Sequence, residues 1–120
     1  MTECETIKSI TSGKTLTVFL EGDVDHHNAR QIRSRIDTKV YIQRPDELVL
    51  DLSRVNFMDS SGLGLIMGRI ALMRELSGEA VLKNPTDKVL RIVRLSGLER
   101  MIKIIFDCDE GENGYANKGQ

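Results

Sequence analysis

The feature that most constrains this fold is a strand pattern that leads directly into a helix pattern in the middle of the chain. Residues 47–52 (Glu-Leu-Val-Leu-Asp-Leu) are largely apolar, which is typical of a buried strand. After a short polar loop, apolar residues recur at helical spacing and predict a helix whose core-facing side is formed by Leu63, Ile66, Met67, Ile70 and Met73. This strand, loop and helix order is the basic unit of an α/β fold.

The rest of the chain repeats this order after an initial hairpin. Alternating apolar residues predict strands over 2–10 and 14–22, and Ser12-Gly13-Lys14 predicts the turn between them. The remaining patterns predict a helix over 28–42, a strand over 79–83, a helix over 87–95 and a strand over 101–106. We therefore expect a mixed, mainly parallel sheet with helices packed on it.

Composition limits the chain to one domain and a narrow set of partners. It has 120 residues, a formal net charge of -1 and 4% aromatic residues, so no basic, aromatic surface for nucleic acid is expected. No apolar run approaches the ~20 residues that cross a bilayer, and the first residues are acidic where a signal peptide is basic. We expect a cytoplasmic protein that binds neither nucleic acid nor membrane.

Domain limits and cysteine usage follow from the same composition. Residues 1–106 form the predicted domain, whereas residues 107–120 lack apolar periodicity and predict a poorly ordered tail. Cys4 and Cys108 lie near opposite ends and have no second pair to complete a zinc site, so free thiols are expected. The sequence predicts no metal and no cofactor.

Two polar loops are predicted to meet at one edge of the sheet. Residues 23–28 follow the second strand, and residues 55–61 follow the strand at 47–52. The carboxyl ends of parallel strands meet at one edge, where ligand and partner sites gather. If the two strands are parallel neighbours, this edge brings together Asp23, Asp25, Asp59, Ser60 and Ser61.

Ser60 and Ser61 fall on the first turn of the central helix, where unpaired N–H groups and the positive end of the helix dipole lie. A hydroxyl there can cap the helix or carry a phosphate. Gly62, Gly64 and Gly68 together oppose helix formation by about 2 to 3 kcal/mol. Either a partner backbone approaches them closely, or they let the helix pack tightly on its own sheet; for Gly68 alone the second interpretation is favoured.

These residues resemble the STAS domain of anti-sigma factor antagonists. The resemblance rests on Phe57-Met58-Asp59-Ser60-Ser61-Gly62-Leu63-Gly64, on Gly22-Asp23-Val24-Asp25-His26-His27-Asn28-Ala29 and on Leu95-Ser96-Gly97-Leu98. The Asp-His-His element and Met67-Gly68-Arg69 are most similar to the sporulation-type antagonist of sigma factor F regulation. Two departures are Gly22-Asp23-Val24-Asp25, where many members have Gly-Glu-hydrophobic-Asp, and a polar tail where the family often ends in a helix.

The resemblance implies a STAS fold and a regulatory function. Members bind an anti-sigma factor that is also a serine kinase and thereby free the sigma factor. The kinase phosphorylates the serine after the aspartate, here Ser60, which ends binding, and a serine phosphatase resets the cycle. The implied partner-binding residues are Asp23, Asp25, Asp59, Ser60, Ser61, Gly62, Leu63 and Gly64.

Structural interpretations and rival functions stay open beside this one. Ser60 could be only a helix cap, Ser61 a structural hydroxyl, and Asp25 a cap of the helix at 28–42. A serine hydrolase using Ser60 lacks the Gly-x-Ser-x-Gly elbow, so no enzyme is expected. An anion- or nucleotide-binding or stress-signalling STAS module is the alternative function. We interpret the adjacent His26 and His27 as loop residues, and Lys88, Arg91 and Arg94 as a solvated helix face.

Overall fold

A computed structural model describes residues 7–107, in which five strands form one sheet in the order β1-β2-β3-β4-β5. The hairpin strands β1 (Ile7–Ser12) and β2 (Thr15–Val24) are antiparallel. All further pairings are parallel, and they join β2 to β3 (Glu47–Met58), β4 (Glu79–Lys83) and β5 (Lys103–Ile105). The predicted α/β class and the mixed, mainly parallel sheet are confirmed. Cys4, Cys108 and the tail from residue 108 onward lie outside the described residues.

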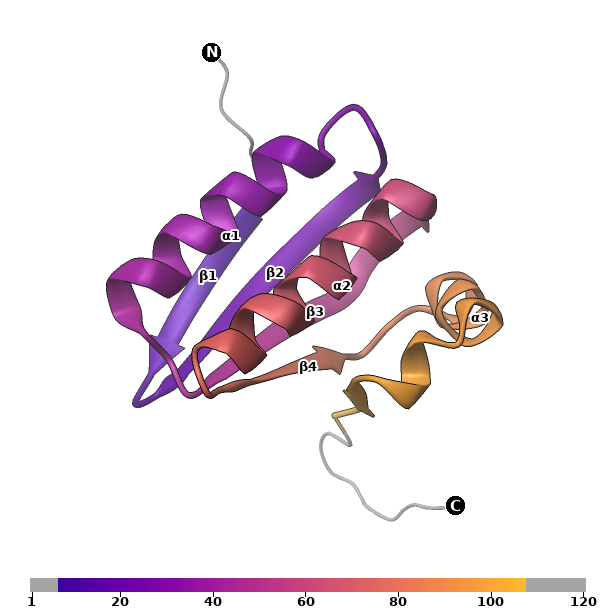
Figure 1. The fold of residues 1–120 in the computed structure, drawn as a ribbon. Helices are drawn as coiled ribbons and strands as arrows, with labels where there is room; N and C mark the ends of the chain where they lie inside the picture. The colour runs from indigo at the N-terminus through magenta and orange to yellow at the C-terminus, as the bar shows by residue number, and fades with distance from the viewer. Residues whose placement is uncertain (1–6, 108–120) are drawn as a thin grey trace.

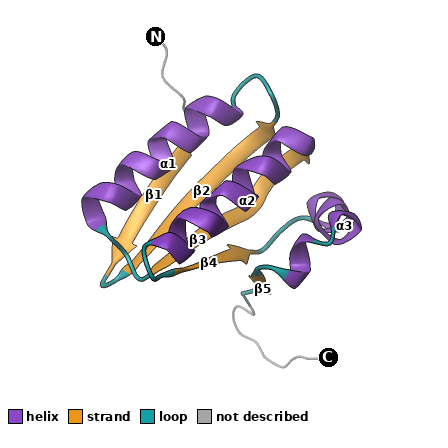
Figure 2. Cartoon of the chain, viewed as in Figure 1, coloured by secondary structure: helices purple, strands orange, loops and turns teal. Residues whose placement is uncertain are grey.

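Two of the three α-helices found within residues 7–107 cover one face of this sheet. Figure 1 shows α1 (Ala29–Gln43) and α2 (Ser60–Glu75) side by side in front of the strands. In Figure 2, α3 (Asp87–Ser96) lies past the end of β4, before a short 3-10 turn at Leu98–Arg100. No helix within residues 7–107 has the length and apolar character that crossing a membrane requires.

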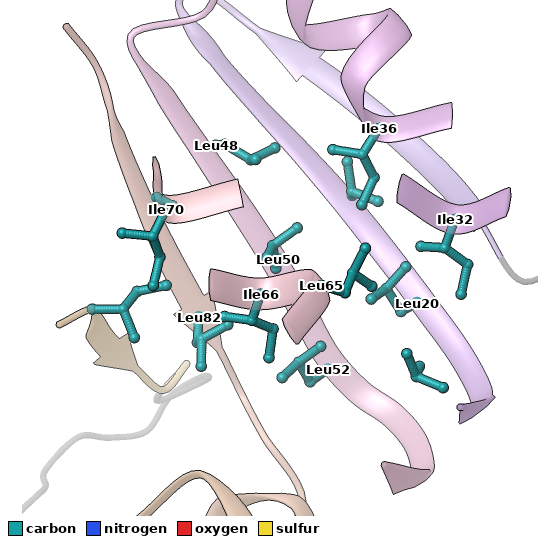
Figure 3. Close-up of a cluster of buried hydrophobic side chains, with 14 of the residues drawn as sticks. Leu20, Ile32, Ile36, Leu48, Leu50, Leu52, Leu65, Ile66, Ile70 and Leu82 are labelled. Carbon is teal, nitrogen blue, oxygen red and sulfur yellow. The ribbon is translucent and has the colours of Figure 1, made fainter. Parts of the chain in front are cut away.

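The core lies between the sheet and the two long helices. Alternate residues of each strand face the helices, so β2 contributes Leu16, Val18 and Leu20, all of them buried as their alternation predicts. Figure 3 shows Leu50 and Leu52 of β3 beside Ile66 of α2. This apolar layer holds α2, and with it the central loop, against the sheet.

The third helix is positioned at both of its ends. The Thr86 hydroxyl accepts a hydrogen bond from the Val89 N–H and donates one to the Val55 carbonyl, so the start of α3 is tied to β3. Gly97 ends the helix with a φ of +81°, a left-handed conformation that glycine adopts without strain. The predicted helix at 87–95 is confirmed, and its end next to β3 shapes the surface described below.

Several predicted strand limits are wrong because pairing between strands overrides the local pattern. The first strand, predicted to end at residue 10, continues to Ser12 because its last two residues still pair with β2, and its predicted start at residue 2 lies outside the described residues. The strand predicted to end at residue 52 continues to Met58, because β2 keeps pairing with it after shifts in register. Its partner β2 continues to Val24 rather than to residue 22 for the same reason. The last strand is only Lys103–Ile105, because the residues before it form the 3-10 turn and its neighbour β4 is short.

The buried face of α2 is rotated from the predicted one. Ile66, Ile70 and Met73 are buried as predicted and Leu63 packs against the core, but Met67 is 47% exposed. A second buried row, Leu65, Arg69 and Leu72, faces away from Met67 on the helix. The predicted inward position of Met67 is therefore wrong, since packing against α1 as well as the sheet shifts the buried arc.

Candidate functional site

The two polar loops meet at one edge of the sheet, as the sequence predicts. They meet because β2 and β3 are parallel neighbours whose last paired residues are Val24 and Met58. The Asp59 N–H donates to the Val24 carbonyl at 3.3 Å, so the loop after β2 and the start of α2 are joined directly. Asp23, Asp25, Asp59 and the two serines therefore share one surface at the carboxyl ends of these strands.

Asn28 closes the loop that follows β2. Its side-chain amide donates to the Asp23 carbonyl at 2.8 Å, and its side-chain oxygen accepts from the Asp25 N–H at 3.0 Å. The Asp25 carboxylate accepts from the His27 N–H at 2.9 Å, whereas Asn28 is the N-cap residue of α1. The prediction that Asp25 caps α1 is wrong, because its side chain stabilises the turn before the helix.

Asp59 is the N-cap of α2. Its carboxylate accepts from the Ser61 N–H at 2.8 Å and from the Gly62 N–H at 3.3 Å. Burial acts to raise the pKa of Asp59, but these two N–H groups and nearby His26 lower the pKa below its ordinary value. The carboxylate is therefore ionised at neutral pH and occupies first-turn N–H groups that an external anion would otherwise use.

Ser60 is the first residue of α2, and it is exposed. Since Asp59 caps the helix, the interpretation of Ser60 as the cap is wrong. No hydrogen bond recorded within residues 7–107 engages the Ser60 hydroxyl. The neighbouring Ser61 is half-buried and supplies its N–H to the cap. The structure thus separates the pair into one accessible hydroxyl and one that lies closer to the domain.

The three glycines of α2 fall into two groups. A Cβ at Gly62 would overlap the Met58 side chain and lie 3.0 Å from the Val24 carbonyl oxygen, so this glycine lets the helix pack on its own strands. A Cβ at Gly64 or Gly68 would meet nothing within 4 Å. Packing within the described domain therefore explains Gly62 alone, and the interpretation of Gly68 as a tight-packing residue is wrong.

Gly64 belongs to the outward face of α2. Residues four, seven and eleven positions after Ser60 lie on the same side of a helix, and this row is Ser60, Gly64, Met67 and Ala71. All four are exposed, and only the serine carries a polar side chain. We call these four residues the α2 outer face; it is a weakly polar surface that begins at the Ser60 hydroxyl.

The two histidines lie beside the carboxylates of the site. The closest approaches are 3.8 Å from His26 Nδ1 to Asp59 Oδ2 and 3.6 Å from His27 Nδ1 to Asp25 Oδ1, and both imidazoles are largely exposed. In residues 7–107, no hydrogen bond joins Ser60 to a histidine, and no three metal-ligating side chains form a cluster. The described geometry contains no serine–histidine pair of the kind a hydrolase uses.

Sequence reasoning missed two features of the domain. Arg69 is buried, with a side-chain exposure of 6%, and its Nε lies 3.0 Å from Asp37 Oδ1 of α1. Burial lowers the pKa of Arg69 and Asp37 acts to raise it, but an arginine stays charged at neutral pH. Phe57, the other feature, is 49% exposed at the end of β3. The signal for Phe57 in the sequence is an aromatic residue next to a polar loop.

The structure combines a mixed five-stranded sheet with an accessible serine that directly follows the N-cap aspartate of its helix. This combination defines a small α/β domain of the STAS type. The chain belongs to the STAS domain family, whose model matches residues 5–111. The resemblance noted in the sequence is thereby confirmed.

Several relatives of this chain are named anti-sigma factor antagonists. The anti-sigma F factor antagonist of Paenibacillus polymyxa is 36% identical over 89 residues, which are 74% of this chain and 76% of the relative. The solved structure of the anti-sigma factor antagonist SpoIIAA in its unphosphorylated form is similar with a TM-score of 0.74 and 29% identity, covering 86% of this chain and 89% of that one. The phosphorylated form of the Bacillus cell fate determinant SpoIIAA gives a TM-score of 0.68 and 28% identity, covering 86% and 92%.

Proposed function

We propose that this protein is an anti-sigma factor antagonist that is switched by phosphorylation of Ser60. In its unmodified form it binds an anti-sigma factor that also acts as a serine kinase, and this binding frees the sigma factor. Phosphorylation of Ser60 by that kinase ends the binding, and a serine phosphatase restores the unmodified form. The names of the relatives support the class of function, and the accessible Ser60 hydroxyl supports the position of the switch.

The observation that carries this proposal is the division of roles between Asp59 and Ser60. Because Asp59 supplies the cap of α2, Ser60 can be modified without removing a hydrogen bond that holds the helix. A phosphate adds about -1.5 to -2 charge, and a helix N-terminus favours such a charge by about 0.3 to 1 kcal/mol. Repulsion from Asp59 opposes this gain. The two effects roughly cancel, so the domain keeps its fold.

At the partner surface no comparable gain offsets the charge of the phosphate. The proposed surface consists of the α2 outer face together with Asp23, Asp25 and Asp59 at the loop edge; Ser61, Gly62 and Leu63 contribute by shaping the first turn behind it. A partner that packs on the α2 outer face has to desolvate whatever stands at Ser60. An unpaired dianion there costs several kcal/mol, and each 1.4 kcal/mol is about tenfold in affinity.

The test is phosphorylation by the cognate kinase with ATP, followed by mapping of the modified residue by mass spectrometry. Wild type, Ser60→Ala and Ser61→Ala are compared, and the last is the matched control because it removes the adjacent hydroxyl. We expect one phosphate on wild type and on Ser61→Ala, and none on Ser60→Ala. Modification of Ser61 alone, or of neither serine, would contradict the proposal.

Titration calorimetry on the same kinase tests the consequence for binding. The unmodified protein is expected to bind, and the phosphorylated protein to bind at least tenfold more weakly. Circular dichroism of both forms, which should give the same spectrum, separates lost binding from lost folding. Equal affinities for the two forms would refute the switch even if Ser60 is the modified residue.

A further inference from the structure

A groove of about 440 Å³ lies between the end of β3 and α3, outside the site described so far. Its walls are Asn56 and Phe57 on the strand side and Asp87, Lys88, Arg91 and Ile92 on the helix side. Phe57 is 49% exposed, although an aromatic ring of this size gains free energy when it is buried. The groove therefore offers an aromatic surface that the described part of the chain leaves accessible.

The rim of this groove is cationic. Lys88 and Arg91 are both exposed, and none of the ion pairs recorded within residues 7–107 includes either of them. Arg94, one turn further along α3, differs because its Nε lies 3.3 Å from Glu99 Oε1. Asp87 is the one acidic residue of the lining. The groove thus combines an apolar wall with an excess of positive charge.

The groove adjoins the switch surface. Phe57 is three residues before Ser60, so their Cα atoms are at most about 11 Å apart. Phe57 also pairs in register with Asp23 of the loop edge. On the other flank, the Arg74 guanidinium of α2 donates to the Met101 carbonyl, which follows α3. Phe57 and Ser60 are therefore close enough for one partner protein to contact both.

From these contacts we infer that the groove receives a second segment of the same kinase that docks on Ser60. This segment places an apolar side chain against Phe57 and presents carboxylates to Lys88 and Arg91. The inference rests on the proposed function, because it extends the interface proposed there. One half of the extended interface is acidic and contains Gly64, and the other half is basic and contains Phe57. Opposite charges on the two halves fix the orientation in which the kinase binds.

Other occupants fit the groove less well. A second copy of this chain, joined through a two-fold axis, brings the same cations together and repels itself. Nucleic acid prefers a broad basic surface with several stacking rings, whereas this groove has one aromatic residue and the chain has a net charge of -1. A protein segment with an acidic and an apolar residue matches both features of the lining.

Binding of the unmodified protein to its kinase tests the inference by titration calorimetry at low and physiological salt. The variants are Phe57→Ala, which removes the ring, and Arg91→Glu, which reverses the charge. Arg35→Glu is the matched control, because Arg35 is an exposed arginine on α1 with no recorded ion pair. We expect the two groove variants to bind at least tenfold more weakly, Arg35→Glu to stay within about twofold of wild type, and all variants to melt like wild type.

Carbodiimide cross-linking of the complex tests the acidic character of the segment. This reagent joins an amine to a carboxylate that touches it, so we expect Lys88 to be linked to an aspartate or glutamate of the kinase. Lys14, exposed at the hairpin turn on the opposite edge of the sheet, should not be linked. A link from Lys14 but not from Lys88 would overturn the inferred position of the segment.

The outcomes separate this inference from the proposed function. If wild type binds the kinase and the groove variants bind equally well, the groove inference is wrong and the proposed function stands. If wild type itself does not bind, both are wrong. If wild type self-associates, and the groove variants lose this self-association but still bind the kinase, a second copy is the occupant and the inference is overturned.

Discussion

Replacing Gly64 by alanine should make the domain more stable and its partner binding weaker. A glycine inside a helix costs about 0.8 to 1 kcal/mol relative to alanine. Because a Cβ at this position meets nothing within 4 Å, no clash offsets the gain. We expect Gly64→Ala to raise the free energy of unfolding by about 1 kcal/mol, which for a domain of this size raises Tm by about 4 °C.

The effect on binding has the opposite sign. Gly64 lies one helical turn from Ser60, about 6 Å along the axis, so a partner that covers the serine covers this glycine too. An added methyl group has to be accommodated by a surface that fits bare backbone. We expect the affinity for the kinase to fall by about tenfold to a hundredfold, or about 1.4 to 2.8 kcal/mol.

Two other glycines of α2 serve as controls. Gly68→Ala should give the same stabilisation but keep its affinity, because Gly68 is half-buried and lies outside the α2 outer face. Gly62→Ala should destabilise the domain by about 1 to 3 kcal/mol, since its Cβ would overlap Met58 and approach the Val24 carbonyl. Thermal melts and calorimetry measure both quantities.

Each result of the Gly64→Ala experiment has a distinct meaning. Higher stability with unchanged affinity would show that the partner does not approach this turn, and it would refute the docking surface proposed around Ser60. A loss of stability would contradict the open position of Gly64 itself. Only the combination of a more stable domain and weaker binding supports the reasoning.

Three further predictions concern the residues around the switch. Ser60→Ala should leave Tm within about 2 °C of wild type because Asp59 caps the helix, and a Tm loss as large as that of a lost cap would contradict this assignment. Because folding lowers the pKa of Asp59, the charge of this carboxylate stabilises the domain fully above about pH 5, and the stabilisation is lost as pH falls through the folded pKa. The Tm values of wild type and Asp59→Asn should therefore converge in acid. A constant Tm difference down to about pH 2 would exclude this linkage. Asp37→Ala should destabilise the domain by about 1 to 3 kcal/mol in urea unfolding, because it leaves the buried Arg69 charge without its carboxylate. The double variant Asp37→Ala with Arg69→Met should recover part of this loss. If it recovers none, the unpaired charge is not the cause.

The fold was largely predictable because its signals are local. The apolar alternation of Leu16, Val18 and Leu20 and the apolar run at 47–52 each identify a strand without knowledge of its neighbours. Strand ends were less predictable. The continuation of β3 to Met58 depends on pairing with Asp23 and Val24 of β2, which lie more than thirty residues earlier in the chain. Local patterns contain no information on such a partner.

The loop cluster was predictable because it depends only on chain order and parallel pairing. The roles within the cluster were not. Asp59 and Ser60 are both good N-cap residues, and only the two N–H groups on the Asp59 carboxylate decide between them. Similarly, Met67 satisfies the helical period, but it is turned outward because the buried row on the opposite side of the helix is Leu65, Arg69 and Leu72. Arg69 was unpredictable as a core residue because its burial requires Asp37 on another helix.

The separation of Asp59 and Ser60 also explains why a serine at the first residue of the helix, rather than at the cap itself, suits the proposed switch. A phosphorylated N-cap would lose its hydrogen bond to the first turn at the moment of modification, so the domain would report the change by partial unfolding of α2. With the cap fixed on Asp59 and the turn held by Gly62 on Met58, the modified surface differs from the unmodified one in charge and volume alone. Under the proposed function, the kinase distinguishes the two forms by this difference in charge and volume, so the affinity difference between them should be set by the interface and not by the stability of the domain.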